Sequence, residues 1–244
     1  MDEHPTQGMA TEDVPPPAGL FEDIIDVFVN PRALFLRQKH PKFWGALVVL
    51  ALLSAVLLYA AATAIAPVLQ VEAMRAMEGN PAVEPGTPPP SFMTSPVIQA
   101  VGAAIAGPLF TLLLGVFVWL VGKVFGFKGS IAHGLAIAVF ANYPRMLNPI
   151  AEVVQSLFLD INRLTSRVQL SLGPARFLDP ETTSATMRGL ATRFDLTTLW
   201  VTVLIGVGLA VTGRMSTGRA AAAAFTLWLV ASLLTAATAG FTMA

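Results

Sequence analysis

The feature that most constrains this chain is an apolar run without a single charge, from Phe43 to Leu69. At about 1.5 Å of rise per residue, a helix over this run would be about 40 Å long. The hydrocarbon core of a bilayer is about 30 Å thick, so such a helix would cross it with some tilt. Lys42 and Trp44 would anchor its start at the membrane surface. The run therefore predicts a transmembrane helix.

Four further apolar runs follow, at residues 95–122, 131–159, 196–213 and 220–241. We therefore expect an all-α, polytopic membrane protein with five transmembrane helices within residues 43–244. The run at 131–159 is the least regular, because Pro144 and Pro149 interrupt it. One kinked span is the simplest interpretation of this run. Two half-helices that enter and leave the membrane on the same side are the alternative.

The segment before the first span is expected to have two parts. Residues 1–19 are acidic and rich in proline, which predicts a disordered cytoplasmic tail. Residues 20–42 contain two short amphipathic patterns, and Asn30 and Pro31 supply an N-cap and a first helical position for the second. These helices either lie along the bilayer surface as interfacial helices or pack on the protein's own cytoplasmic face. The sequence favours neither arrangement.

The composition excludes several classes of function. Only 12% of the residues are charged, against roughly 25% in soluble domains. The formal net charge is zero, so there is no basic field that would attract nucleic acid. The chain has no cysteine, and its three histidines are scattered, which gives no metal-ligand spacing. It also lacks a phosphate-binding loop and a nucleophile elbow. We expect no enzymatic activity, cofactor or metal.

The candidate functional residues are polar side chains inside the third apolar run. Arg145 and Glu152 are seven residues apart, so a continuous helix would place them on one face, two turns apart. An arginine at the bilayer centre costs about 2.5–3.5 kcal/mol on insertion scales, so it needs a partner or water. One interpretation is a polar cavity near the midplane. The other is that Pro144 breaks the helix and leaves Arg145 at an interface, with a structural role. The complete candidate set is His133, Asn142, Arg145, Asn148 and Glu152.

His133 has two interpretations of its own. It begins the third apolar run, so it either sits at the start of a helix near the lipid headgroups or relays protons. The first is the simpler expectation.

Five spans with the N-terminus in the cytoplasm would leave the C-terminus outside, in the inner or plasma membrane of the cell. Basic residues at 32–42 agree with the excess of positive charge on the cytoplasmic side of membrane proteins. Several arginines between residues 160 and 195 oppose this orientation, because they would lie on the outer side of the membrane. That loop is long and also carries acidic residues, which weakens the objection.

The order of several short motifs resembles the Yip-one-like integral membrane protein family, in its prokaryotic form, over about residues 20–240. The motifs are an amphipathic run with Asn-Pro before the first span, the Gly-Lys-x-Phe-Gly-Phe-Lys-Gly-Ser turn, Tyr-Pro in the third run, and the segments at 194–200 and 215–220. The resemblance implies five transmembrane helices with a cytoplasmic N-terminus. Eukaryotic relatives bind prenylated Rab GTPases. This chain lacks their Tyr-Gly-Pro stretch and Gly-Tyr pair, so we do not expect a Rab-type GTPase as its partner.

These observations favour a non-enzymatic integral membrane protein that organises or scaffolds membrane, or recruits partners. The expected partners are the lipid bilayer and either a second copy of the chain or another membrane protein. Small residues four apart, such as Gly102 and Ala106, allow close helix approach within or between chains. The alternative is a transporter or channel for a small solute or ion, with Arg145 and Glu152 in its path.

Overall fold

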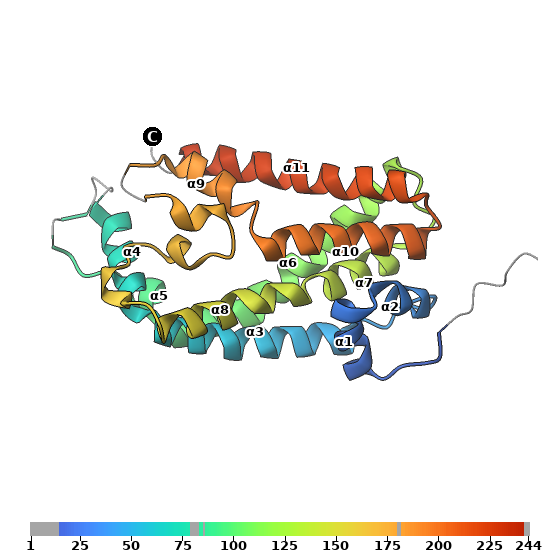
Figure 1. The fold of residues 1–244 in the computed structure, drawn as a ribbon, viewed down its shortest axis with the longest axis horizontal. Helices are drawn as coiled ribbons and strands as arrows, with labels where there is room; N and C mark the ends of the chain where they lie inside the picture. Colours follow the sequence, from blue (N-terminus) through green and yellow to red (C-terminus); the bar gives the residue numbers. More distant parts are fainter. Residues whose placement is uncertain (1–14, 79–82, 85, 180–181, 242–244) are drawn as a thin grey trace, which may run out of the picture.

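The computed structural model describes residues 15–78, 83–84, 86–179 and 182–241. Every regular element in these ranges is a helix, which confirms the all-α prediction. Most of the predicted tail at residues 1–19 lies outside the described residues. The described chain forms an elongated bundle whose long helices run side by side (Figure 1).

Within these described ranges, four helices are long and apolar enough to cross a membrane: α3 (Trp44–Ala64), α6 (Pro96–Val124), α10 (Leu196–Gly213) and α11 (Thr217–Phe241). Their bounds follow four of the five predicted spans. The first span is shorter than predicted, because α3 ends at Ala64 and the chain turns into α4 (Ala66–Glu78). Pro67 explains the turn, since it has no N–H to donate to the carbonyl of Thr63. The short helix α5 (Ser91–Thr94) then leads into α6.

The third predicted span is a broken helix. It consists of α7 (Ile131–Ala141), the 3-10 turn η1 (Tyr143–Met146) and α8 (Leu147–Ser156). Pro144 accounts for the break, because it lacks the N–H that would continue the hydrogen bonds of α7. The combined length of the three pieces is at most about 40 Å. In Figure 1 they run from the end of the bundle where α6 finishes towards the end where α3 finishes.

Two contacts give the direction of this segment relative to α3. The hydroxyl of Tyr143 donates to the carbonyl of Ala46, near the start of α3, at 2.7 Å. Three residues further on, the sulfur of Met146 lies 3.6 Å from the hydroxyl of Ser54, in the middle of α3. The broken helix therefore runs parallel to α3 and covers the same part of the bundle.

The core is centred on α7, whose residues 136–141 are all buried. Two glycines allow α7 to cross α6 at close range. A Cβ on Gly134 would lie 2.7 Å from the carbonyl oxygen of Gly115, and a Cβ on Gly115 would lie 2.7 Å from the Cα of Leu135. Since real Cβ contacts are longer, only glycine fits at this crossing.

The N-terminal helices are α1 (Leu20–Val29) and α2 (Pro31–Arg37), which confirms the predicted pair. The side chain of Asn30 accepts from the N–H of Ala33, so Asn30 is the predicted N-cap. Phe35 of α2 is buried and packs near Gly208 of α10. Arg37 pairs with Asp23 and Asp26 of α1 and thereby ties the two helices together.

The two helices differ in what they bury. The apolar face of α2 packs on the protein, whereas α1 leaves Phe21, Ile25 and Val29 exposed. Thus α2 packs on the protein's own bundle, which is one of the two predicted arrangements. Of the two helices, α1 is the one that leaves an apolar face exposed.

The segment between α8 and α10 folds at the end of the bundle opposite α1 and α2 (Figure 1). It contains η2 (Ile161–Arg163), η3 (Arg167–Leu170), η4 (Pro174–Phe177) and α9 (Ala185–Thr192). α9 lies against α11, where the indole N–H of Trp228 donates to the carbonyl of Arg193 at 3.0 Å. α11 runs towards this same end, so the described chain begins and ends at opposite ends of the bundle.

Candidate intramembrane polar site

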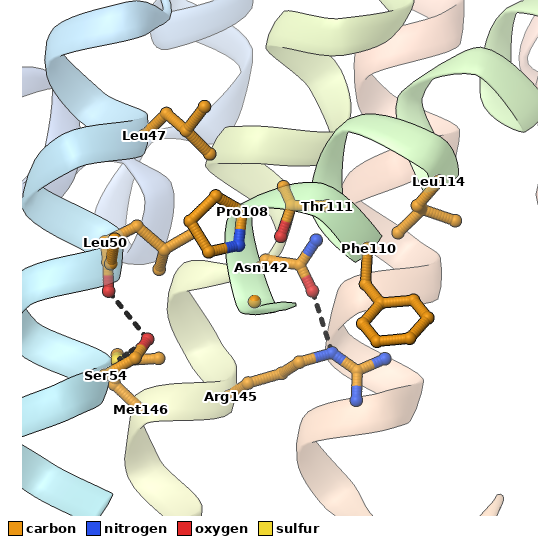
Figure 2. Close-up of a pocket in the computed structure, with 12 residues that line it drawn as sticks. Leu47, Leu50, Ser54, Pro108, Phe110, Thr111, Leu114, Asn142, Arg145 and Met146 are labelled. Carbon is orange, nitrogen blue, oxygen red and sulfur yellow. Dashed lines mark hydrogen bonds between the residues drawn. The ribbon is translucent and has the colours of Figure 1, made fainter. Parts of the chain in front are cut away.

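The break at η1 brings Asn142 and Arg145 together. Asn142 is buried, and its side-chain N–H donates to the carbonyl of Ala138 at 2.8 Å. Its side-chain oxygen accepts from Nε of Arg145, also at 2.8 Å (Figure 2). Asn142 thus holds the arginine in one orientation, because each end of its amide has a defined partner.

Arg145 lines a cavity of about 360 Å³ between η1, α3 and α6. The lining residues come from the first half of α3 and from the middle of α6, the longest of the described helices, which places the cavity about halfway along α6. The lining comprises Leu47, Leu50, Ala51 and Ser54 of α3, Gly107, Pro108, Phe110, Thr111 and Leu114 of α6, and Asn142, Arg145 and Met146 (Figure 2).

Among the residues that the structure describes, Arg193 and Asp195 are the charged groups that act electrostatically on Arg145. The carboxylate of Asp195 is already engaged: one oxygen accepts from the N–H and hydroxyl of Thr197, and the other from the N–H of Leu172, at 2.7–3.0 Å. The guanidinium of Arg193 donates to the hydroxyl of Ser232 at 3.2 Å. Arg145 and Arg193 are positive and Asp195 is negative, so the three groups together carry one positive charge.

Glu152 has a different partner from Arg145. Its two carboxylate oxygens accept from Nε and Nη2 of Arg167, at 2.7 and 2.8 Å. The side chain of Glu152 is only 9% exposed. Glu152 is not among the residues that line the Arg145 cavity. The helical spacing put the two charges on one face, but the structure gives each a separate environment.

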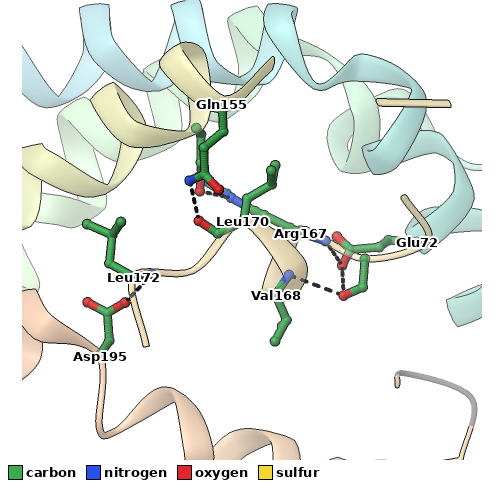
Figure 3. A network of polar contacts seen from close by, with 9 residues as sticks. Glu72, Gln155, Arg167, Val168, Leu170, Leu172 and Asp195 are labelled. Carbon is green, nitrogen blue, oxygen red and sulfur yellow. Dashed lines mark hydrogen bonds and ion pairs between the residues drawn. The ribbon is translucent and has the colours of Figure 1, made fainter. Parts of the chain in front are cut away.

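The Glu152–Arg167 pair belongs to a polar network between the end of α8 and the loop that follows. Figure 3 shows Arg167 in this network with Glu72, Gln155 and Leu170. Glu72 of α4 accepts from the hydroxyl of Ser166 at 2.6 Å and from the backbone N–H of Arg167 at 2.7 Å. The side-chain amide of Gln155 donates to the carbonyl of Leu170 at 2.9 Å. The network therefore ties α4, α8 and η3 to one another.

The remaining two candidates lie elsewhere. His133 is in the first turn of α7, as predicted, where its Nδ1 accepts from the backbone N–H of Ser130 at 3.2 Å. It lines a second cavity, of about 480 Å³, together with Lys39 and Arg214. The side-chain oxygen of Asn148 is buried and has no hydrogen-bond partner among the described residues. Of the five candidates, the structure therefore brings only Asn142 and Arg145 together in the cavity.

Sequence reasoning did not identify the arginines of the 160–195 loop as internal partners. Arg167 binds Glu152, Arg176 donates to the side chain of Gln155 at 3.1 Å, and Arg193 donates to Ser232. No sequence signal points to these pairs, because 15 to 39 residues separate the partners. Among the described residues, no group of histidine and acidic side chains could hold a metal ion.

Residues 25–238 match the Yip1 domain. The chain belongs to the Yip1 domain family. This confirms the resemblance seen in the short motifs, and the match extends from α1 to α11. Yip1-family proteins are multi-span membrane proteins and are generally non-enzymatic. No curated protein and no solved structure matches this Yip1-domain chain.

Proposed function

We propose that this Yip1-domain protein crosses the membrane of the cell five times, with its N-terminus in the cytoplasm and its C-terminus outside. The support is the path of the broken helix α7–η1–α8, which runs between the two ends of the bundle in alternation with the four long helices. The α6–α7 and α10–α11 connections and the α1–α2 pair share one end, and that end carries Lys123, Lys128, Arg214 and Arg219.

The opposite end holds the 160–195 loop, whose arginines oppose this orientation by charge. The first membrane helix usually dominates the orientation of a protein, and basic residues stand directly before α3. This favours the cytoplasmic N-terminus in spite of the arginines in the loop.

Single cysteines can test this topology, because the chain has none of its own. Phe177→Cys and Gly218→Cys change no charge and lie at opposite ends of the bundle; Phe177 is exposed, and an added Cβ at Gly218 meets no atom within 4 Å. In intact cells, we expect a membrane-impermeant maleimide to label the cysteine at 177 and to leave the one at 218 unlabelled until the cells are opened. The reverse pattern, with the cysteine at 218 labelled and the one at 177 protected in intact cells, would contradict this topology and is the pattern that a re-entrant third segment would give, because α10 places the two positions on opposite sides.

We further infer that the protein acts as a membrane scaffold, which organises lipid or recruits a second copy or another membrane protein. The observation that carries this inference is the separation of Arg145 from Glu152. The carboxylate of Glu152 accepts two hydrogen bonds from the guanidinium of Arg167 and does not line the cavity. Of the two charged residues, Arg145 is the one that lines it. Charges that are fixed at separate positions support a rigid bundle more than a conduction path.

A transporter of small solutes or ions is the second candidate, and one observation favours it. Arg145 lines a cavity about halfway along α6, and charged residues within membrane-spanning segments commonly mark a pathway. Transport by this route would need the cavity to open alternately to both sides.

Proteoliposomes containing the purified protein separate the two candidates. Energy transfer between copies that carry donor and acceptor dyes measures self-association, and release of entrapped anions or cations measures flux. The scaffold predicts energy transfer above that of randomly mixed proteins, with no flux above empty vesicles. Flux that Arg145→Gln abolishes while helicity is retained, and that Arg163→Gln leaves intact, would establish the transporter instead.

A further inference from the structure

The cavity beside Arg145 has the construction of a ligand site. Its volume of about 360 Å³ lies within the roughly 300–1,000 Å³ of small-molecule sites, which are mostly apolar with a few placed polar groups. Leu47, Leu50 and Leu114 supply apolar walls, and Asn142 orients the charged group. Phe110 lines the cavity and is 70% exposed, so the cavity reaches the outer surface of the bundle.

The charges around the site favour an anion as its ligand. Within the part of the chain that the structure describes, the Arg145 side chain has one hydrogen bond, from Nε to the neutral oxygen of Asn142. Its two terminal nitrogens have no hydrogen-bond partner there. Asp195 is the nearby negative group, but Thr197 and Leu172 occupy its oxygens, and Arg193 offsets its charge. One positive charge is left over beside the cavity, where the surrounding hydrocarbon makes it costly.

The depth of the cavity decides which anion fits. Half of the hydrocarbon core is about 15 Å, so the phosphate of an ordinary phospholipid remains about that far from the middle of the bilayer. A carboxylate at the end of a single alkyl chain is a much smaller headgroup. Its two oxygens match the fork of a guanidinium, and such pairs are frequently bidentate. The alkyl chain would contact the leucine walls and leave past Phe110 into the lipid.

We propose that the cavity between α3, α6 and η1 binds the carboxylate of a long-chain fatty acid through Arg145, with the alkyl chain against the apolar walls. The ligand enters from the lipid phase. It neutralises Arg145 and fills the space that the three helical segments leave open.

Photo-crosslinking in lipid nanodiscs tests this site. The probe is a palmitate that carries a photoactivatable diazirine on its chain, and its binding is titrated on the full-length protein. We expect crosslinks in the peptides of α3 and α6 that line the cavity. Unlabelled palmitate should compete, hexadecanol should compete at least about tenfold more weakly because it lacks the charge, and inorganic phosphate should not compete.

Two variants probe the site and two serve as controls. Arg145→Gln removes the charge, and Gly107→Leu adds a side chain at the cavity wall, where an added Cβ meets no atom within 4 Å. Each should weaken palmitate binding at least about tenfold. Gly102→Leu on the same helix also meets no atom, and Arg163→Gln removes an arginine that is 86% exposed. Both controls should bind as the wild type does.

Three results would overturn the proposal. The first is unchanged binding in both Arg145→Gln and Gly107→Leu. The second is equal competition by hexadecanol, which would remove the role of the carboxylate. The third is competition by inorganic phosphate, which would make the site one for free anions. If Arg145→Gln does not fold, Gly107→Leu against Gly102→Leu decides: a selective loss at 107 supports the site, and equal binding rejects it.

Discussion

Arg167→Gln is expected to destabilise the bundle strongly, although Arg167 lies in a loop. The substitution removes both hydrogen bonds to Glu152, whose side chain is 9% exposed, and leaves a carboxylate without its cation. Breaking a buried pair in this way typically costs about 3–5 kcal/mol. Because the side chain of Arg167 is 34% exposed, water reduces this cost, and we expect about 2–3 kcal/mol.

A double-mutant cycle measures this interaction directly. Thermal unfolding in detergent is followed for Arg167→Gln, Glu152→Gln and the double variant. The double variant should lose at least about 1 kcal/mol less than the sum of the single variants, because the second substitution removes the unpaired charge that the first one leaves.

The matched control is Arg163→Gln, which removes an arginine of the same loop with an exposed ion pair to Asp160. Its effect should stay within about 0.5 kcal/mol. The reasoning fails if Arg167→Gln is as mild as this control, or if the effects of Arg167→Gln and Glu152→Gln simply add.

Three further perturbations test the packing. Gly134→Leu forces a side chain into the backbone of α6 and should cost at least about 1–3 kcal/mol in the same unfolding assay, as overpacked cores typically do. Gly102→Leu should be neutral, and equal stability of the two variants would reject the close crossing. Tyr143→Phe removes the hydrogen bond to the carbonyl of Ala46 and should cost about 1–2 kcal/mol, which the same melting curves would show. A fluorescent label attached at Ile25→Cys, on the exposed apolar face of α1, should be shielded from aqueous quenchers in vesicles. Full accessibility to the quencher would mean that α1 does not lie on the membrane.

Most of the helical framework could be predicted because its signals are local. An uncharged apolar run needs no knowledge of its neighbours to specify a membrane-crossing helix, so α6 and α10 have nearly the predicted bounds. Asn30 and Pro31 marked the start of α2 for the same reason, since capping involves only adjacent residues. Pro144 marked the position of the break in the third run, because a missing N–H interrupts a helix wherever it stands.

The surroundings of the polar residues were decided by the tertiary structure. The seven-residue spacing of Arg145 and Glu152 described one helix face, but the turn at η1 and the loop after α8 gave each residue its own partner. The apolar pattern of α2 was equally consistent with lipid or protein as its neighbour. In the structure α2 packs on α10, so its neighbour is protein. Such contacts join residues far apart in the chain, and they depend on how the helices pack together. The sequence by itself therefore determined which segments are helical and apolar enough to cross a membrane, whereas the packing of the helices decided that Arg145 faces a cavity and Glu152 does not.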